Sequence, residues 1–188
     1  LGTKPGVTKE KFLEKVKNND FSDLFEERSV KTGDFIDVTP GTVHASLKGS
    51  VIFAEIQQSS DITYRIYDFD RIDKDGKKRE LHLDNAADVI DFGKKVEIKN
   101  TNFKNGETEK NIIKNKFYSI DKIKILNSYE DSCSESMIIY TVLDGNGKIF
   151  WNENEFLELK KGENILIPVN VKVQLEGNFE ILRTTIEE

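Results

Sequence analysis

The sequence has little of what marks disulfide-rich or membrane proteins. It contains a single cysteine, Cys133, so no disulfide can form within the chain, and a reducing compartment is favoured. No stretch approaches the ~18 consecutive apolar residues that a membrane-spanning helix needs. We therefore predict a cytoplasmic protein for which a membrane is not a partner.

An excess of basic residues is also missing. Lys and Arg total 28 against 34 Asp and Glu, which gives a formal charge of -6, and the two signs are interspersed along the chain. This distribution argues against a nucleic-acid partner, which a broad basic face would attract. The hydrophobic share of 37% and the charged share of 33% fit a globular protein, and 188 residues suffice for one large domain or two small ones.

The chain begins with Leu1, and its one methionine is Met137. Position 1 is therefore not expected to be where translation begins, and no charged stretch followed by an apolar core indicates a signal peptide. We expect an N-terminal segment of a parent protein to precede this chain and to be one of its partners.

Apolar spacing predicts the secondary structure. Spacings of three to five predict two short helices within 8–27, with Thr8 as the N-cap of the first, and a connecting helix from Asn85 to Phe92. Elsewhere, short apolar runs between turn residues are typical of β structure. Strands are expected at 35–38, 51–57, 63–67, 117–126, 136–143, 147–151, 154–159, 164–168 and 179–184, with a hairpin turn at 144–147.

The resulting prediction is a mainly β protein in four parts. These are a helical segment (1–28), a first β-rich module that ends in the connecting helix (29–92), a connector (93–116) and a second β-rich module (117–188). Trp151, Phe150 and Phe156 are expected to fill the core of the second module.

Both β-rich modules contain the same short pattern. Lys31-Thr32-Gly33-Asp34 corresponds to Lys160-Lys161-Gly162-Glu163, and each is followed by an apolar strand that ends at a proline. Eleven residues after the glycine lies His44 in the first copy and Val173 in the second. The two segments are therefore interpreted as copies of one structural unit.

The glycine, strand, proline turn and histidine resemble the second motif of the cupin superfamily, whose histidine commonly binds a metal inside a small jelly-roll β-barrel. This resemblance implies two cupin-like barrels, of which the first keeps His44 as a metal ligand and the second is metal-free. An imidazole nitrogen suits a borderline-soft divalent cation. The alternative is that His44 is a hydrogen-bonded or exposed imidazole without a metal.

A longer stretch identifies a family. Glu55-Ile56-Gln57-Gln58-Ser59-Ser60-Asp61, Tyr64-Arg65 and Arg79-Glu80-Leu81-His82, together with Gly41-Thr42-Val43-His44-Ala45, closely resemble the bacterial type I mannose-6-phosphate isomerases. The resemblance extends from Lys4-Pro5 to the C-terminal module. It implies that the chain is the C-terminal part of such an enzyme.

The resemblance also implies a function and site residues. Members of the family interconvert mannose 6-phosphate and fructose 6-phosphate with a zinc ion bound by one Gln, two His and one Glu. His44 matches one zinc ligand, Arg65 the active-site arginine, and Asp61 a residue that lines the substrate pocket. The other three ligands have no counterpart in this chain, so zinc binding and activity of the chain alone are expected to be weak or absent.

Elementary chemistry is compatible with these roles. Moving a proton between C1 and C2 through an enediol places negative charge on two oxygens, which the permanently cationic Arg65 can stabilise. Glu55 on an apolar strand is interpreted as a substrate-binding residue in a barrel cavity, because polar groups inside a barrel are costly unless paired. Ordinary surface or turn positions remain the alternatives for Arg65 and Asp61, and an internal hydrogen bond for Glu55.

Three other features receive structural interpretations. His82 is predicted to be structural, and Lys77-Lys78-Arg79 to be a solvated turn, although that basic run could also attract a phosphate. Cys133 lies among acidic residues, which are expected to disfavour its thiolate. Two functions follow: part of a zinc-dependent aldose-ketose isomerase, or a non-catalytic module that binds sugar phosphates.

Overall fold

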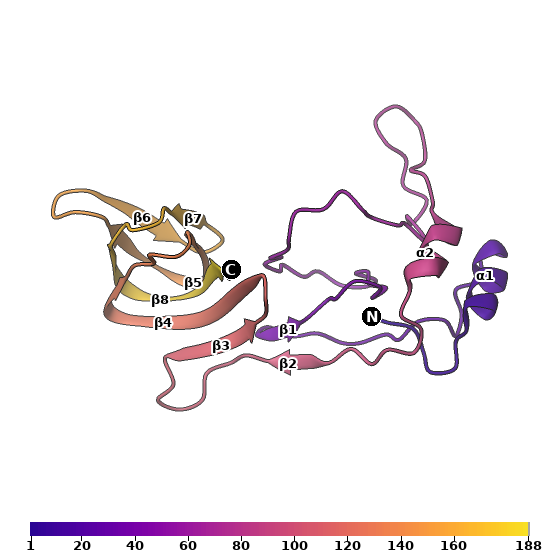
Figure 1. Cartoon of the computed structure of the whole chain (residues 1–188), viewed down its shortest axis with the longest axis horizontal. Helices are drawn as coiled ribbons and strands as arrows, with labels where there is room; N and C mark the ends of the chain where they lie inside the picture. Colours follow the sequence, from indigo (N-terminus) through magenta and orange to yellow (C-terminus); the bar gives the residue numbers. More distant parts are fainter. Residues whose placement is uncertain (188) are drawn as a thin grey trace. The chain divides into compact units, whose positions relative to one another are not determined.

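The computed structural model describes residues 1–187, which form two compact units, Leu1–Lys99 (unit 1) and the residues from Asn100 onward (unit 2). Unit 1 contains two helices and little regular β structure, whereas unit 2 is a single antiparallel sheet (Figure 1). Neither helix in the described residues is long and apolar enough to cross a membrane.

The first helix of unit 1, α1 (Lys9–Lys17), begins where the sequence predicts. The Thr8 side chain accepts a hydrogen bond from the backbone N–H of Lys11, which satisfies one of the free donors of the first turn. Glu10 lies in the first turn and Lys15 and Lys17 in the last, an order that complements the helix dipole. The second predicted helix does not form, because the chain turns at residues 22–24 and then bridges Thr3 through Phe25.

The second helix, α2 (Leu83–Val89), packs against α1 and forms the core of unit 1 with it. The predicted connecting helix runs from Asn85 to Phe92, so the observed helix starts two residues before the predicted start and ends three residues before the predicted end. The buried core comprises Val7, Phe12, Val16, Leu24 and Ala87. Phe12 and Val16 lie on α1 at the spacing that the sequence predicts, whereas Leu24 reaches the core from a turn and not from the predicted second helix.

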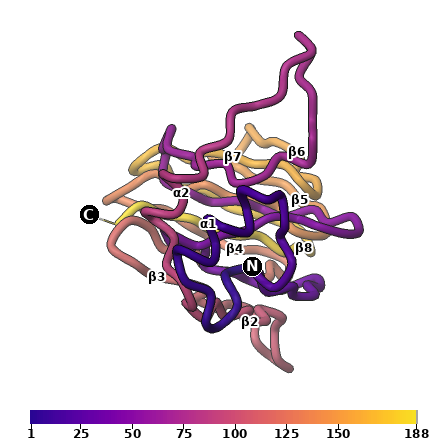
Figure 2. Tube along the Cα trace, turned by 90° about the vertical axis from the view of Figure 1, so that its right-hand side faces the viewer, coloured from indigo at the N-terminus to yellow at the C-terminus, as the bar shows by residue number. Residues whose placement is uncertain are grey.

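The first β-rich module does not appear as a cupin barrel. Unit 1 has one two-stranded sheet, β1 (Asp34–Ile36) with β2 (Ile98–Asn100), and the predicted strands 51–57 and 63–67 have no regular structure. The segment that precedes α2 extends away from both helices (Figures 1 and 2). Strand-forming residues need a neighbouring strand, and within the described residues 51–67 pair with none; Ile52 and Ile62 are therefore exposed.

Unit 2 has six strands in one antiparallel sheet of order β3-β4-β8-β5-β6, with β7 paired to β5. The pairs β4–β8 and β5–β8 run through twelve or more residues and curl around one core (Figure 1). The bounds of these strands are β3 (Glu109–Lys114), β4 (Tyr118–Asp131), β5 (Ile138–Phe150), β6 (Phe156–Lys160), β7 (Asn164–Ile167) and β8 (Val173–Ile186).

The core of unit 2 follows the two-residue period of its strands. On β8, Val173, Leu175, Phe179 and Ile181 face inward, and Tyr140 on β5 is fully buried among them. Gly177 occupies the inward position between Leu175 and Phe179, so this row lacks one side chain. The alternation places the apolar side chains on one face of the sheet, which encloses the single core.

Three details of unit 2 differ from the sequence prediction. Residues 144–147 do not make a hairpin: they continue β5 after an irregularity in register between Val142 and Asp144, with Gly145 in the left-handed region (φ 77°). β3 lies within the predicted connector. Trp151 and Phe156 do not fill the core, since they are 41% and 43% exposed at the β5–β6 connection.

Candidate functional site

Arg65 belongs to a cluster of three arginines around one carboxylate. Asp68 is buried, and Arg79 holds it with two hydrogen bonds: Nε lies 2.8 Å from Oδ2, and Nη2 donates to Oδ1. Arg65 Nε and Arg71 Nη2 lie 3.7 and 3.6 Å from the same Oδ1. The structure therefore gathers side chains that are up to 14 positions apart in the sequence.

His82 positions the backbone of Arg65. The Arg65 N–H donates to Nδ1 of the imidazole at 3.2 Å, and the Arg65 carbonyl accepts the backbone N–H of His82 at 2.8 Å. His82 also precedes the first residue of α2, so this two-way contact anchors Arg65 to the start of that helix. The structural interpretation of His82 is confirmed.

The cluster carries more positive than negative charge. The hydrogen bond from Arg79 lowers the pKa of Asp68, against the opposing effect of burial, so Asp68 stays ionised at neutral pH. Three guanidinium groups face one carboxylate, and the Arg71 side chain is 64% exposed. An excess of cationic donors with accessible ends suits an anionic ligand, above all one with several oxygens.

The sequence analysis did not foresee the role of Asp68 or Arg71. Arg79 was placed in a solvated turn, yet it makes the strongest contact of the cluster. The available signal was the run of five arginines and lysines between Arg71 and Arg79, together with Asp68, whose neighbours are the aromatic residues Tyr67 and Phe69. Spacing alone could not show which acid would become buried.

His44 lies outside this cluster. Its ring is exposed, and its Nδ1 is 3.0 Å from the carbonyl oxygen of Thr42. The preceding Gly41 is held closely, because a Cβ there would lie 2.6 Å from the Val89 carbonyl oxygen, and its own carbonyl accepts the N–H of Asp91. The backbone that carries His44 is thus fixed against the end of α2.

The two copies of the repeat form the same turn, at residues 31–34 and 160–163. The N–H of Asp34 donates to the Lys31 carbonyl at 3.1 Å, and that of Glu163 to the Lys160 carbonyl at the same distance. Gly33 and Gly162 have φ values of 87° and 89°. A strand follows each turn, but the eleventh residue differs in environment: Val173 is buried at the start of β8, whereas His44 is exposed.

Glu55 and Asp61 lie on the irregular segment and are both exposed. Within the described residues, no hydrogen bond or ion pair joins either of them, or His44, to Arg65. The structure therefore brings Arg65 together with residues 68, 71, 79 and 82, and does not bring it together with the other three predicted site residues.

A zinc site was tested against the side chains present. Among residues 1–187 no group of three or more His, Cys, Asp or Glu side chains is close enough to hold a metal ion. A tetrahedral zinc site needs at least three protein ligands. The described side chains do not fit zinc by themselves, and His44 could supply one ligand at most.

Cys133 differs from its prediction. Its Sγ accepts the backbone N–H of Ser136 at 3.4 Å, and this hydrogen bond, with a second from Glu135, lowers the pKa of the thiol. The acidic neighbours along the sequence were expected to act in the opposite direction. Local backbone donors outweigh them because they point at the sulfur.

Comparison with known proteins identifies the fold class first. Residues 108–186 match the family model described as "Mannose-6-phosphate isomerase, cupin domain", and they comprise nearly all of the six-stranded sheet. Unit 2 is therefore a cupin domain. The fold prediction is confirmed for a mainly β chain with two helices and one cupin domain. Of the two predicted barrels, the structure contains the C-terminal one.

Similarity over the whole chain identifies the family. The chain is 33% identical over 183 residues to a mannose-6-phosphate isomerase of Streptococcus mutans, which covers 96% of this chain and 57% of the relative. It is 33% identical over 179 residues to the mannose-6-phosphate isomerase ManA of Bacillus subtilis, with 94% and 56% covered. The chain belongs to the mannose-6-phosphate isomerase family, as the sequence motifs predicted.

A solved structure gives the same result. The crystal structure of the mannose 6-phosphate isomerase from Bacillus subtilis matches with a TM-score of 0.73 at 26% sequence identity, covering 97% of this chain and 58% of that chain. The chain spans little more than half the length of the curated relatives that it matches.

Proposed function

We propose that this chain is the C-terminal part of a zinc-dependent aldose-ketose isomerase that interconverts mannose 6-phosphate and fructose 6-phosphate. The observation that carries the proposal is the identity of 33% to a mannose-6-phosphate isomerase across 96% of the chain. The single cysteine favours a reducing compartment, so we keep the cytoplasm as its location.

Arg65 is the residue that we assign to the chemical step. Transfer of a proton between C1 and C2 through an enediol develops negative charge on two adjacent oxygens, and a fixed guanidinium stabilises that charge. Arg65 suits this role because its backbone is held from both sides by His82 and its side chain is 25% exposed. Asp61 and Glu55 are assigned to substrate binding from the sequence, and His44 to the metal.

Arg71 and Arg79 give the same region an affinity for phosphate. A sugar phosphate carries a dianionic group whose oxygens accept several N–H donors at once. The excess of positive charge around Asp68 would attract that group, while Asp68 fixes the arginines in one arrangement. The residues in the loop before α2 would thus bind one end of the substrate.

The proposal is tested in a protein of full family length. A chimaera in which this chain replaces the matching part of the Streptococcus mutans relative is assayed for conversion of mannose 6-phosphate to fructose 6-phosphate. We expect activity, and a loss of kcat by about a hundredfold or more for Arg65→Ala with little change in KM. Arg28→Ala is the matched control, since Arg28 pairs with Glu26 and, among the described residues, has no hydrogen bond or ion pair to the arginine cluster. A folded chimaera without activity would overturn the proposal.

The second candidate function is a non-catalytic module that binds sugar phosphates. The arginine cluster favours it independently, because the cluster needs no metal to attract an anion. EDTA separates the two candidates: it should abolish turnover by an isomerase and leave the affinity of a binding module for mannose 6-phosphate unchanged.

A further inference from the structure

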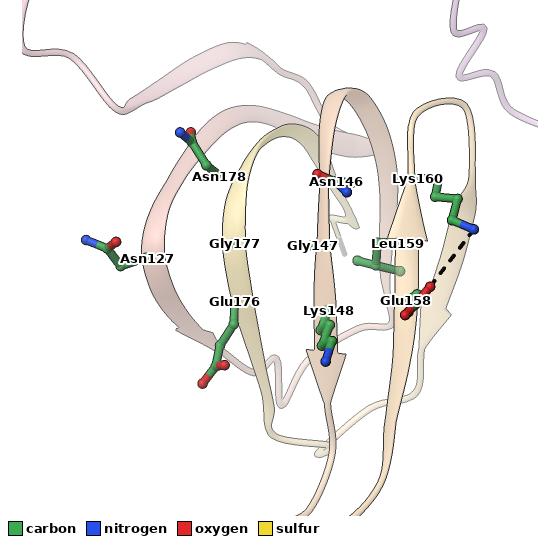
Figure 3. Close-up of a pocket in the computed structure, with 10 residues that line it drawn as sticks. All are labelled: Asn127, Asn146, Gly147, Lys148, Glu158, Leu159, Lys160, Glu176, Gly177 and Asn178. Carbon is green, nitrogen blue, oxygen red and sulfur yellow. Dashed lines mark ion pairs between the residues drawn. The ribbon is translucent and has the colours of Figure 1, made fainter.

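The cupin domain contains an open groove across four strands that the proposed function does not use. It has a volume of about 710 Å³ and lies over the middle of β4, β8, β5 and β6 (Figure 3). Sites for small organic ligands commonly have volumes of about 300–1,000 Å³. The groove is open to solvent, and its volume suits a ligand of about two rings.

Two facing glycines form the floor of this groove. Gly147 on β5 pairs with Gly177 on β8, and a Cβ on Gly177 would lie 2.8 Å from the Cα of Gly147. A Cβ on Gly147 would lie 2.2 Å from Cε1 of Phe179, so the ring occupies the space beneath that strand. The missing side chains let β5, β8 and the Phe179 ring pack closely on the inner face of the sheet. The groove lies on the outer face, between the exposed side chains of the neighbouring positions.

Three amide side chains line the groove, one from each of three neighbouring strands. Asn127 lies on β4, Asn178 on β8 and Asn146 on β5, and all three are exposed (Figure 3). Within the described part of the chain, none of these amides makes a side-chain hydrogen bond, whereas most other asparagines of unit 2 do, such as Asn111 and Asn152. Each free amide offers two donors and one acceptor oxygen to a ligand.

The charged residues of the groove occur in compensating sets. Glu158 and Lys160 form an ion pair at 4.0 Å, and Lys148 lies opposite Glu176 in the strand register. Two lysines against two glutamates leave no net charge. A phosphate or a carboxylate would gain little here, so the groove favours an uncharged ligand with many hydroxyl groups.

An exposed aromatic ring borders the groove. The Nζ of Lys148 lies 4.3 Å from the centre of the Phe156 ring, which is 43% exposed and packs at a tilt against Phe150, with 5.3 Å between the ring centres. Leu159, the apolar side chain in the lining, is buried, so the accessible lining is polar. The exposed Phe156 ring beside Lys148 adds an apolar surface at the edge of the groove. Sugar rings have this combination, with hydroxyl edges and C–H faces.

We propose that this groove binds a neutral saccharide of about two rings. The amides of Asn127, Asn146 and Asn178 exchange hydrogen bonds with its hydroxyl groups, and Phe156 contacts a C–H face. Because the groove is open, the affinity is low and most of it comes from these few contacts. The groove is lined by residues of unit 2 alone, whereas the arginine cluster belongs to unit 1, and binding in the groove does not depend on isomerase activity.

The test is a titration of the ¹⁵N-labelled chain with maltose, cellobiose and mannobiose, followed by NMR. At least one of these sugars should shift the side-chain NH₂ signals of the three asparagines, and glucose 6-phosphate should shift them less. The double variant Asn146→Ala/Asn178→Ala should weaken binding by about tenfold, the loss expected for two hydrogen bonds. Asn105→Ala, at an exposed turn elsewhere in unit 2, should leave binding unchanged.

Two results would overturn the proposal. The first is the absence of shifts at the three asparagines with all three sugars at millimolar concentrations. The second is a stronger response to glucose 6-phosphate, which would show an anion site. Circular dichroism of both variants checks folding, and Phe156→Ala provides a second test because it lies at the exposed rim rather than in the core.

Discussion

Arg183 on β8 and Asp131 at the end of β4 form a doubly hydrogen-bonded ion pair in the cupin domain. Arg183 Nε lies 2.6 Å from Asp131 Oδ2 and Nη2 lies 3.1 Å from Oδ1, and the two side chains are only 17% and 8% exposed. The hydroxyl of the buried Tyr140 donates to the same carboxylate. This network joins the ends of β4, β5 and β8, so it supports the packing of the barrel.

Removal of the Asp131 charge should destabilise the cupin domain. Asp131→Asn leaves the Arg183 guanidinium without its partner in a poorly solvated place, and we expect the free energy of unfolding to fall by about 3 kcal/mol. Urea denaturation followed by circular dichroism measures the change. Asp144→Asn, which breaks the pair with Lys161, should cost much less, because both partners are exposed and screened by solvent. Equal losses in the two variants would contradict the argument.

Tyr129 and Tyr140 should ionise at higher pH in the folded protein than in the unfolded chain. Burial, with the Asp131 charge, raises the pKa of Tyr129 to about 12 and also raises that of Tyr140. Because the folded pKa of Tyr129 exceeds the unfolded value, its contribution to stability is present below pH 10 and is lost between about pH 10 and 12. Absorbance at 295 nm should show a step near pH 12 that Tyr129→Phe removes, while the still later ionisation of Tyr140 is the same in both proteins. A step near pH 12 that persists in this variant would refute the assignment.

Two glycines allow a matched test of close packing. Gly145 and Gly106 have φ values of 77° and 79°, but a Cβ at Gly145 would lie 2.5 Å from the Asn178 carbonyl oxygen, whereas one at Gly106 meets nothing within 4 Å. Gly106→Ala should cost about 1 kcal/mol for its left-handed backbone. Gly145→Ala should cost about 2 kcal/mol more, because β5 and β8 must separate. Thermal unfolding of both variants compares them, and similar losses would exclude the steric effect.

Acid should weaken the arginine cluster around Asp68. The folded pKa of Asp68 is depressed by Arg79, so its contribution to stability is present above the ordinary aspartate pKa and is lost as pH falls through the lower folded value. Urea denaturation at several pH values below 5 measures the free energy of unfolding. That free energy should fall more steeply with decreasing pH for the natural chain than for Asp68→Asn. If both declined in parallel, Asp68 would not be coupled to folding.

Zinc binding by the chain alone should be weak. The residues described include no group of three ligand side chains, and one imidazole does not hold zinc at the affinity of a closed site. After dialysis against metal-free buffer, atomic absorption should find zinc well below one ion per chain, and His44→Ala should not change that content. Stoichiometric zinc in the natural chain would contradict the expectation.

The sequence allowed prediction of features that depend on neighbouring residues. The start of α1 at Thr8, the two equivalent turns at Gly33 and Gly162, and the strand β7 with its end before Pro168 all follow from local hydrogen bonds and backbone preferences. The motifs around Arg65 also sufficed for the family. Such features form from contacts a few residues apart, which a single sequence displays directly.

Tertiary structure decided what depends on partners far along the chain. Residues 51–67 have the composition of strands, but no described strand pairs with them, and 144–147 have the composition of a hairpin, yet β8 holds them within one bulged strand. The burial of Asp68, the exposure of His44 and Phe156, and the groove above Gly147 and Gly177 likewise arise from packing. Backbone pairing and burial are long-range and cooperative, so composition sets which structures are possible and the surrounding strands select one.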